Sequence, residues 1–122
     1  MILTSPRLDA PRPFWQGCQS ARSVVVVEVY GYTIEPGAKL TGANLLVADL
    51  TGVDLRWADL AGADLRGAKL TGANLRRAKL TGANLEGASL TGANLIGAFL
   101  GQANLEGADL REAKLIGANL EG

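Results

Sequence analysis

Hydrophobic and polar positions follow a strict period of five over most of the chain. Leucine occupies every fifth position from Leu40 to Leu120, 17 times without interruption. Alanine stands two positions before each of these leucines, and Val53 is the single exception. Each unit therefore reads alanine, polar residue, leucine, variable residue and usually glycine. A fixed short period indicates a solenoid, in which each unit buries its apolar side against its neighbours.

Neither an α-helix nor a flat strand accommodates this period. A step of five residues turns a helix about 140° past a full circle, so the leucines would scatter around its axis. Along a strand, residues five apart point to opposite faces. A three-residue extended segment followed by a two-residue bend does fit. Alanine and leucine then point inward together, and the polar residue between them points outward.

Glycine dominates the last position of the unit, where the backbone must bend. It fills this position in 12 of 17 units, and it adopts backbone angles that other residues avoid. The other bend positions hold Val47, Trp57, Arg77, Gln102 and Glu112. Because these residues carry side chains, we expect that the bend does not need a positive φ in every unit. Two turn geometries along the solenoid are predicted.

The unit TGANL recurs at residues 41–45, 71–75, 81–85 and 91–95, and LEGADL stands at 105–110. Through these motifs, residues 38–122 resemble the pentapeptide repeat family. The resemblance implies an all-β fold: a right-handed quadrilateral β-helix of about four coils, with leucine and alanine filling its interior. At the usual strand spacing of about 4.8 Å, such a rod is roughly 20 Å long.

Charged residues twenty positions apart test the length of one coil. With twenty residues per coil, Lys39, Asp59 and Lys79 stack in one column, and Asp49 stacks on Lys69. Opposite charges then meet across neighbouring coils, as cross-strand pairs prefer. A coil of fifteen residues fits the charges nearly as well, so the family resemblance favours twenty.

The residues before the repeat differ from it in composition and are expected to cap it. Residues 1–23 carry three prolines and no periodicity, which predicts an irregular or disordered arm. Residues 24–37 are rich in valine and tyrosine and end in Glu-Pro-Gly, which predicts a capping strand and turn. An open β-helix end invites aggregation unless it is covered. We expect this segment to lie over or add to the first coil, with Phe14 and Trp15 either plugging the core or exposed.

The repeat continues to Gly122 with no terminal change of composition. We expect a homodimer through the C-terminal coils, with Leu110, Leu115 and Leu120 as the candidate dimer end. A monomer with a frayed last coil is an equal alternative, and a fragment of a longer solenoid is another.

The composition of the chain disfavours nucleic-acid binding, disulfide bonding and membrane insertion. The chain has 12 basic and 12 acidic residues, so its formal net charge is zero, which disfavours nucleic-acid binding. Cys18 is the single cysteine, so an intrachain disulfide is excluded. No stretch approaches the roughly 20 apolar residues of a membrane helix, and no secretory signal is evident. We expect a cytoplasmic protein without membrane contact; an export or transit peptide is the weaker alternative.

The residue types do not favour catalysis or metal binding. Histidine, the commonest general base and a frequent metal ligand, is absent. Asp49, Asp54, Asp59 and Asp64 occupy the outward position of successive units and therefore point apart. The glycines recur with the repeat and form no phosphate-binding motif. We predict no catalytic residue, no cofactor and no metal site.

Departures from the repeat gather on one side of the predicted solenoid. Trp57 replaces the usual glycine and Phe99 replaces asparagine or aspartate, so both aromatic rings are expected at the surface. Exposed aromatics beside arginines are typical of binding hot spots. The alternative is chance variation on a tolerant surface. The candidate partner surface comprises Arg56, Trp57, Arg76, Arg77, Lys79, Ile96, Phe99 and Ile116.

The sequence leaves two candidate functions, which belong to different functional classes. The first is a non-enzymatic structural or protein-interaction module that presents this surface to an unidentified protein. The second comes from the family resemblance: some pentapeptide proteins imitate duplex DNA and bind DNA gyrase, which confers quinolone resistance. Such mimicry requires a strongly acidic rod. Because the charges here cancel, we favour the first function.

Overall fold

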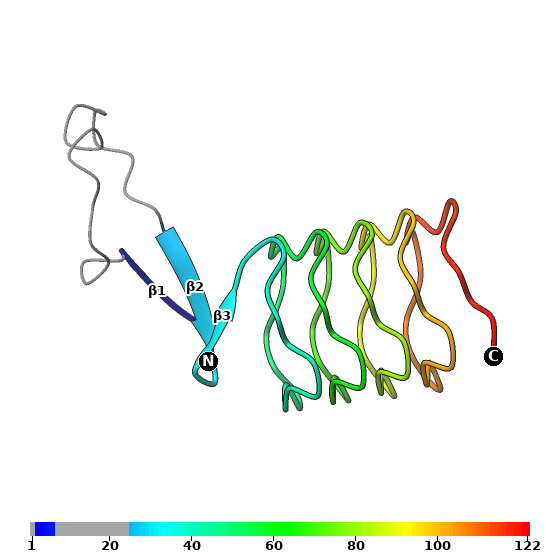
Figure 1. Ribbon diagram of the computed structural model, residues 1–122, viewed down its shortest axis with the longest axis horizontal. Coiled ribbons are helices and arrows are strands. Elements are labelled where there is room, and N and C mark those ends of the chain that lie inside the picture. Colours follow the sequence, from blue (N-terminus) through cyan, green and yellow to red (C-terminus); the bar gives the residue numbers. More distant parts are fainter. Residues whose placement is uncertain (1, 7–24) are drawn as a thin grey trace.

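The computed structural model describes residues 2–6 and 25–122, which form a small antiparallel sheet followed by a solenoid (Figure 1). The sheet has three strands in the order β1 (Ile2–Pro6), β2 (Val25–Val29) and β3 (Tyr32–Ile34). Both strand pairs are antiparallel. The chain leaves β3 and enters the coils directly, so the sheet lies at the N-terminal end of the solenoid.

Parallel bridges between residues twenty apart define the coils. They begin at Lys39 with Asp59 and run to Phe99 with Asn119. Asp64 shows the hydrogen bonds that produce them: its N–H donates to the Ala43 carbonyl at 2.9 Å, and its carbonyl accepts from the Leu45 N–H at 2.8 Å. The coil of twenty residues is therefore confirmed, and the coil of fifteen is excluded. One coil accommodates four five-residue units.

The interior consists of stacked leucine and alanine side chains. Every repeat leucine from Leu45 to Leu95 is 0% exposed, and Val53, the one substitute for alanine, is still buried. No polar or charged residue is buried in the described part of the chain. Burying each leucine stabilises the fold by about 1.5–3 kcal/mol. The periodicity thus predicted the core correctly.

The bend uses one conformation from Gly42 to Gly117, with φ between +50° and +69°, which corrects the prediction of two turn geometries. Val47, Trp57 and Arg77 have φ values of +50°, +60° and +58°, close to the +67° of Gly42. Each bend residue from Gly42 to Gly117 is the third residue of a four-residue turn closed by a leucine carbonyl and the N–H of alanine, or of Val53 after Gly52. This position requires positive φ in type II turns. Left-handed backbone costs a residue with a side chain roughly 1–2 kcal/mol. The N–H of the bend residue also donates to a carbonyl of the next coil, as Val47 does to Arg66 at 2.8 Å. Breaking these hydrogen bonds would disrupt the alignment of the stacked coils.

The N-terminal segment differs from the predicted single strand and irregular arm. Tyr30 and Gly31, with φ of +51° and +81°, form a two-residue turn that splits the expected strand into β2 and β3. Positive φ at both positions is typical of the type I′ hairpin turn, which matches the twist of the flanking strands. Residues 2–6, expected to be irregular, form β1 and pair with β2. Phe14 and Trp15 lie outside the described residues.

The hairpin is joined to the first coil by apolar and polar contacts. Val29 and Ile34 are buried and belong to the same core cluster as the repeat leucines. The Tyr30 hydroxyl donates to the Leu46 carbonyl at 3.1 Å, and the Tyr32 hydroxyl accepts from the Asn44 N–H at 3.3 Å. The hairpin therefore extends the core and bonds the backbone of the first coil.

Candidate functional site

A shallow groove of about 670 Å³ runs along one corner of the solenoid across neighbouring coils. We call it the corner groove. It is lined by Trp57, Arg76, Arg77, Lys79, Ile96, Gly97, Phe99, Ile116 and Gly117. Seven of these nine residues belong to the surface predicted from the sequence, and the structure brings them together.

Three adjacent columns of the repeat build the corner groove. Trp57 and Arg77 stand one coil apart in the bend column, which continues as Gly97 and Gly117. On one side lies the column of residues that directly follow leucine, which holds arginine in the earlier coils and isoleucine in the later ones. On the other side lies the column that holds Lys79 and Phe99. After Arg77 the bulky bend residues give way to glycines, and the Arg77 side chain leans over the first of them, Gly97. Sequence reasoning missed these glycines because they match the ordinary repeat.

Trp57 is held in place by a short chain of polar contacts. The Arg56 guanidinium lies 5.1 Å from the centroid of the Trp57 ring, within the range of a cation–π contact. The same guanidinium binds Asp54 through two hydrogen bonds, Nε to Oδ1 and Nη2 to Oδ2, both 2.8 Å long. The Arg56 side chain, through these bonds, holds the pKa of the Asp54 carboxyl below its usual value. Arg56 itself does not line the groove, but it contacts Trp57, which does.

Pairs of aspartate and arginine two residues apart are the rule in this solenoid. Asp64 binds Arg66 and Asp109 binds Arg111 in the same way as Asp54 binds Arg56, with N to O distances of 2.7 and 2.6 Å. In each pair the aspartate Oδ1 also accepts the backbone N–H of the arginine. This local turn places the carboxylate beside the arginine side chain. The charge columns expected from the sequence do stack, but the ion pairs of the described chain form within single units.

Arg76 breaks this rule. Its backbone N–H donates to Asn74 Oδ1 at 3.2 Å, so the local turn is the same, but asparagine carries no charge. Arg77 and Lys79 likewise have no ion pair within the described residues. Three cations of the corner groove are therefore free of carboxylate partners from the described chain. The signal was present in the sequence as asparagine instead of aspartate two residues before arginine.

The apolar part of the corner groove is open to solvent. Trp57 is 55% exposed, Phe99 46% and Ile116 75%, while Ile96 is half-buried. Large apolar side chains gathered at a surface are typical of protein-interaction sites. The site thus combines four apolar side chains with three positive charges that form no ion pair with the described residues.

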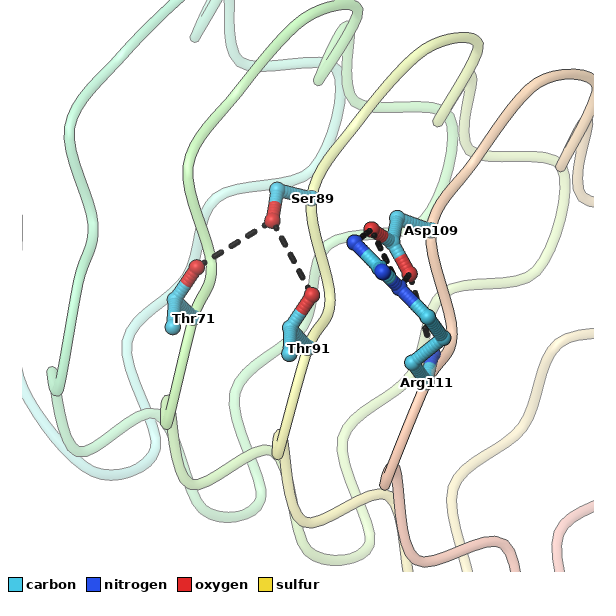
Figure 2. Close-up of polar contacts among 5 residues, drawn as sticks. All are labelled: Thr71, Ser89, Thr91, Asp109 and Arg111. Carbon is cyan, nitrogen blue, oxygen red and sulfur yellow. Dashed lines mark hydrogen bonds and ion pairs between the residues drawn. The ribbon is translucent and has the colours of Figure 1, made fainter.

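A different face of the solenoid carries a ladder of hydroxyl and charged groups (Figure 2). Ser89 Oγ lies 3.1 Å from Thr71 Oγ1 and 3.5 Å from Thr91 Oγ1. Asp109 continues the column of Ser89 in the next coil and binds Arg111, which lowers the pKa of its carboxyl to about 2. The side chains that Figure 2 labels on this face thus contact one another within the solenoid.

Other sequence candidates are placed as follows. The candidate dimer end is exposed, with Leu110 and Leu115 half-buried and Leu120 54% exposed. Within residues 2–6 and 25–122, no three acidic, cysteine or histidine side chains come close enough to hold a metal ion. No helix in this part of the chain is long and apolar enough to span a membrane. Cys18 falls outside the described residues.

The repeat matches a family of known proteins. The family model described as pentapeptide repeats matches in 8 copies, over residues 37–67, 48–87, 58–95 and 88–122. No curated protein matches the chain.

Solved structures of pentapeptide repeat proteins are similar to this chain. One, from the thylakoid lumen of Arabidopsis thaliana, is 40% identical with a TM-score of 0.51, over 52% of this chain and 43% of that one. Another, Rfr23 from the cyanobacterium Cyanothece 51142, is 38% identical with a TM-score of 0.43, over 69% of this chain and 65% of that one. The chain therefore spans less than two thirds of the length of either. Because the family matches together run through residues 37–122, well over half of its length, this chain belongs to the pentapeptide repeat family.

Proposed function

We propose that this chain is a non-enzymatic protein-interaction module that recognises a partner protein through the corner groove. The observation that carries the proposal is the convergence in one groove of Trp57, Phe99 and three cations that have no ion pair within residues 2–6 and 25–122. The scaffold beneath is proposed to be a right-handed quadrilateral β-helix of the kind that the family resemblance implies. Such a stack is rigid, so it holds the groove side chains at fixed spacing.

The composition of the groove is that of a binding hot spot. Tryptophan, arginine and other aromatic residues are enriched where truncation to alanine costs binding energy. Arg56 fixes the Trp57 ring before a partner arrives, which reduces the side-chain entropy lost on binding. The filled leucine core leaves the outer surface as the place for recognition.

DNA mimicry directed at DNA gyrase is the less favoured alternative. Mimicry needs a continuous acidic surface, whereas the net charge is zero and basic side chains interrupt the rod at Arg76, Arg77 and Lys79. The matches to pentapeptide repeat proteins described above give DNA mimicry no support. A supercoiling assay tests it: inhibition of gyrase at low micromolar protein would favour mimicry over the interaction module.

Oligomeric state and location are separate proposals. A second copy of this chain is the proposed occupant of the C-terminal end, where Leu120 is more than half exposed. A molar mass from light scattering equal to that of one chain would contradict the homodimer. We also propose a cytoplasmic location, which fractionation of cells would test.

The proposed function is tested by comparing capture of partner proteins by three forms of the chain. Trp57→Gly combined with Arg77→Gly removes two groove side chains and installs the residue most common in the bend column. Val47→Gly is the matched control, because it makes the same change at another corner. We expect at least one protein to be retained by the native and control forms and lost by the double variant. Identical retention by all three forms would overturn the proposal.

A further inference from the structure

We propose that the corner groove binds an extended acidic segment of a partner protein that also carries a large apolar side chain. The apolar side chain packs between Trp57 and Phe99, and the carboxylates pair with the cations beside them. This inference rests on the proposed function and adds the chemistry of the partner. Three observations carry it: the charges without ion pairs in the described part of the chain, the position of Arg77, and the apolar surface between the two aromatic rings.

The charges of the groove call for an anionic partner. Arginines 56, 66 and 111 each hold a carboxylate two residues earlier in the chain. Arg76 has asparagine at that place, and neither Arg77 nor Lys79 forms an ion pair with the described residues. Carboxylate and guanidinium form short, charge-assisted hydrogen bonds, often in bidentate pairs. A partner that brings carboxylates would complete at Arg76 the arrangement that Asp54 and Asp64 complete elsewhere.

The backbone places Arg77 across the groove. Its φ of +58° belongs to the bend, and its side chain leans toward the next coil over Gly97. A Cβ added to Gly97 would lie 3.2 Å from Arg77 Cγ and 3.9 Å from its Nε. The aliphatic part of Arg77 therefore rests in the space that glycine leaves. This support limits the freedom of the guanidinium before binding, which favours a specific contact with a carboxylate.

The apolar side chains distinguish a peptide from a polyanion. Trp57, Ile96, Phe99 and Ile116 line the groove together with the cations, and Ile96 is half-buried. A phosphate backbone gains nothing from aliphatic side chains, whereas an extended peptide alternates polar and apolar contacts. The rod also carries no net charge that would attract nucleic acid from a distance. An acidic peptide with an apolar anchor satisfies both halves of the site.

Selection from a phage-displayed library of random short peptides tests the inference without knowledge of the partner. The native chain is the bait, and Trp57→Gly with Arg77→Gly is used for counter-selection. We expect enriched peptides that contain aspartate or glutamate together with leucine, phenylalanine or tryptophan. Enrichment of basic peptides, or no enrichment above the double variant, would overturn the inference.

Asn74→Asp provides a sharper variant. By analogy with Asp54 and Asp64, the new carboxylate should bind Arg76 and neutralise it while the local turn is kept. We expect fluorescence anisotropy to show a selected peptide bound about 5- to 50-fold more weakly by this variant, and normally by Val47→Gly. Adding salt should weaken native binding. Unchanged affinity in Asn74→Asp, or tighter binding of a single-stranded oligonucleotide than of the peptide, would contradict the acidic partner.

The outcomes separate this inference from the proposed function. If the double variant loses a captured protein but no acidic peptide is selected, the interaction module stands and the acidic partner is wrong. If capture is also unchanged, both are wrong. Melting curves of each variant, followed by circular dichroism, establish that a loss of binding does not reflect unfolding.

Discussion

The Tyr32 hydroxyl accepts a hydrogen bond from the Asn44 N–H at 3.3 Å, where a preceding coil would otherwise supply a carbonyl. One coil later, the corresponding N–H of Asp64 donates to the Ala43 carbonyl. The Tyr30 hydroxyl does the complementary work by donating to the Leu46 carbonyl. Two side chains of the N-terminal hairpin thus satisfy backbone groups at the exposed edge of the solenoid.

Removing these hydroxyls should loosen the start of the solenoid. Tyr30→Phe and Tyr32→Phe each remove one hydrogen bond and should lower the free energy of unfolding by about 0.5–1.5 kcal/mol. Urea unfolding followed by circular dichroism measures this change. An unchanged free energy in the double variant would show that water satisfies these backbone groups equally well.

The central leucines should dominate stability. Leu75→Ala leaves a cavity in the fully buried stack and should cost about 2–5 kcal/mol of unfolding free energy. Phe99→Asn serves as the surface comparison, because it restores a common residue of the repeat at an exposed position. Denaturant unfolding of both variants provides the test. A loss below about 1 kcal/mol for Leu75→Ala would mean that the leucines are not the stabilising core.

The bend residues offer a test of left-handed strain. Val47 is β-branched and has φ of +50°, so Val47→Gly should raise stability by roughly 0.5–1 kcal/mol. Gly82→Ala should lower stability by about 1–2 kcal/mol, because its φ of +68° is unfavourable for a residue with a side chain. No atom lies within 4 Å of the new methyl group, so this loss would reflect backbone strain and not a steric clash. Thermal melts of the two variants should therefore shift in opposite directions. Shifts of the same sign would argue against one shared bend conformation.

The pair of Asp109 and Arg111 predicts that the stability of the fold depends on pH in the acidic range. Hydrogen bonds from the Arg111 side chain lower the pKa of the Asp109 carboxyl from 3.8 to about 2. The folded pKa lies below the unfolded value, so the contribution to stability is present above about pH 4 and is lost as the pH falls towards 2. An NMR titration should give a midpoint near 2 for Asp109, and Arg111→Gln should raise it. A native midpoint near 3.8 would show that the pair does not form in solution.

Much of the fold was predictable because the period of five admits few backbones. It determines which side chains face inward, so the leucine core and the exposed Trp57 and Phe99 follow from spacing alone. The conformation of the bend did not follow. Side chains at Val47 and Arg77 suggested a second geometry, but the hydrogen bonds between coils outweigh a local strain of about 1–2 kcal/mol. Local propensity carries no information about that balance.

The candidate site was predictable in its membership but not in its shape. Stacking of residues twenty apart places Ile96 next to Arg76 and Phe99 next to Lys79 at one corner, as expected from the repeat. The role of Arg56 could not be foreseen, because its contacts with Asp54 and Trp57 depend on side-chain geometry within the unit. The shape of the groove at Gly97 depends in turn on the direction in which the Arg77 side chain leans.

Site-specific photo-crosslinking at position 57 tests recognition through the corner groove most directly. A photoreactive phenylalanine derivative is placed there in living cells, and the control carries it at position 47, another bulky bend position on a different corner. We predict a discrete light-dependent adduct with a partner protein from position 57 and none from position 47. No adduct at position 57, or the same adduct from both positions, would contradict recognition at the groove.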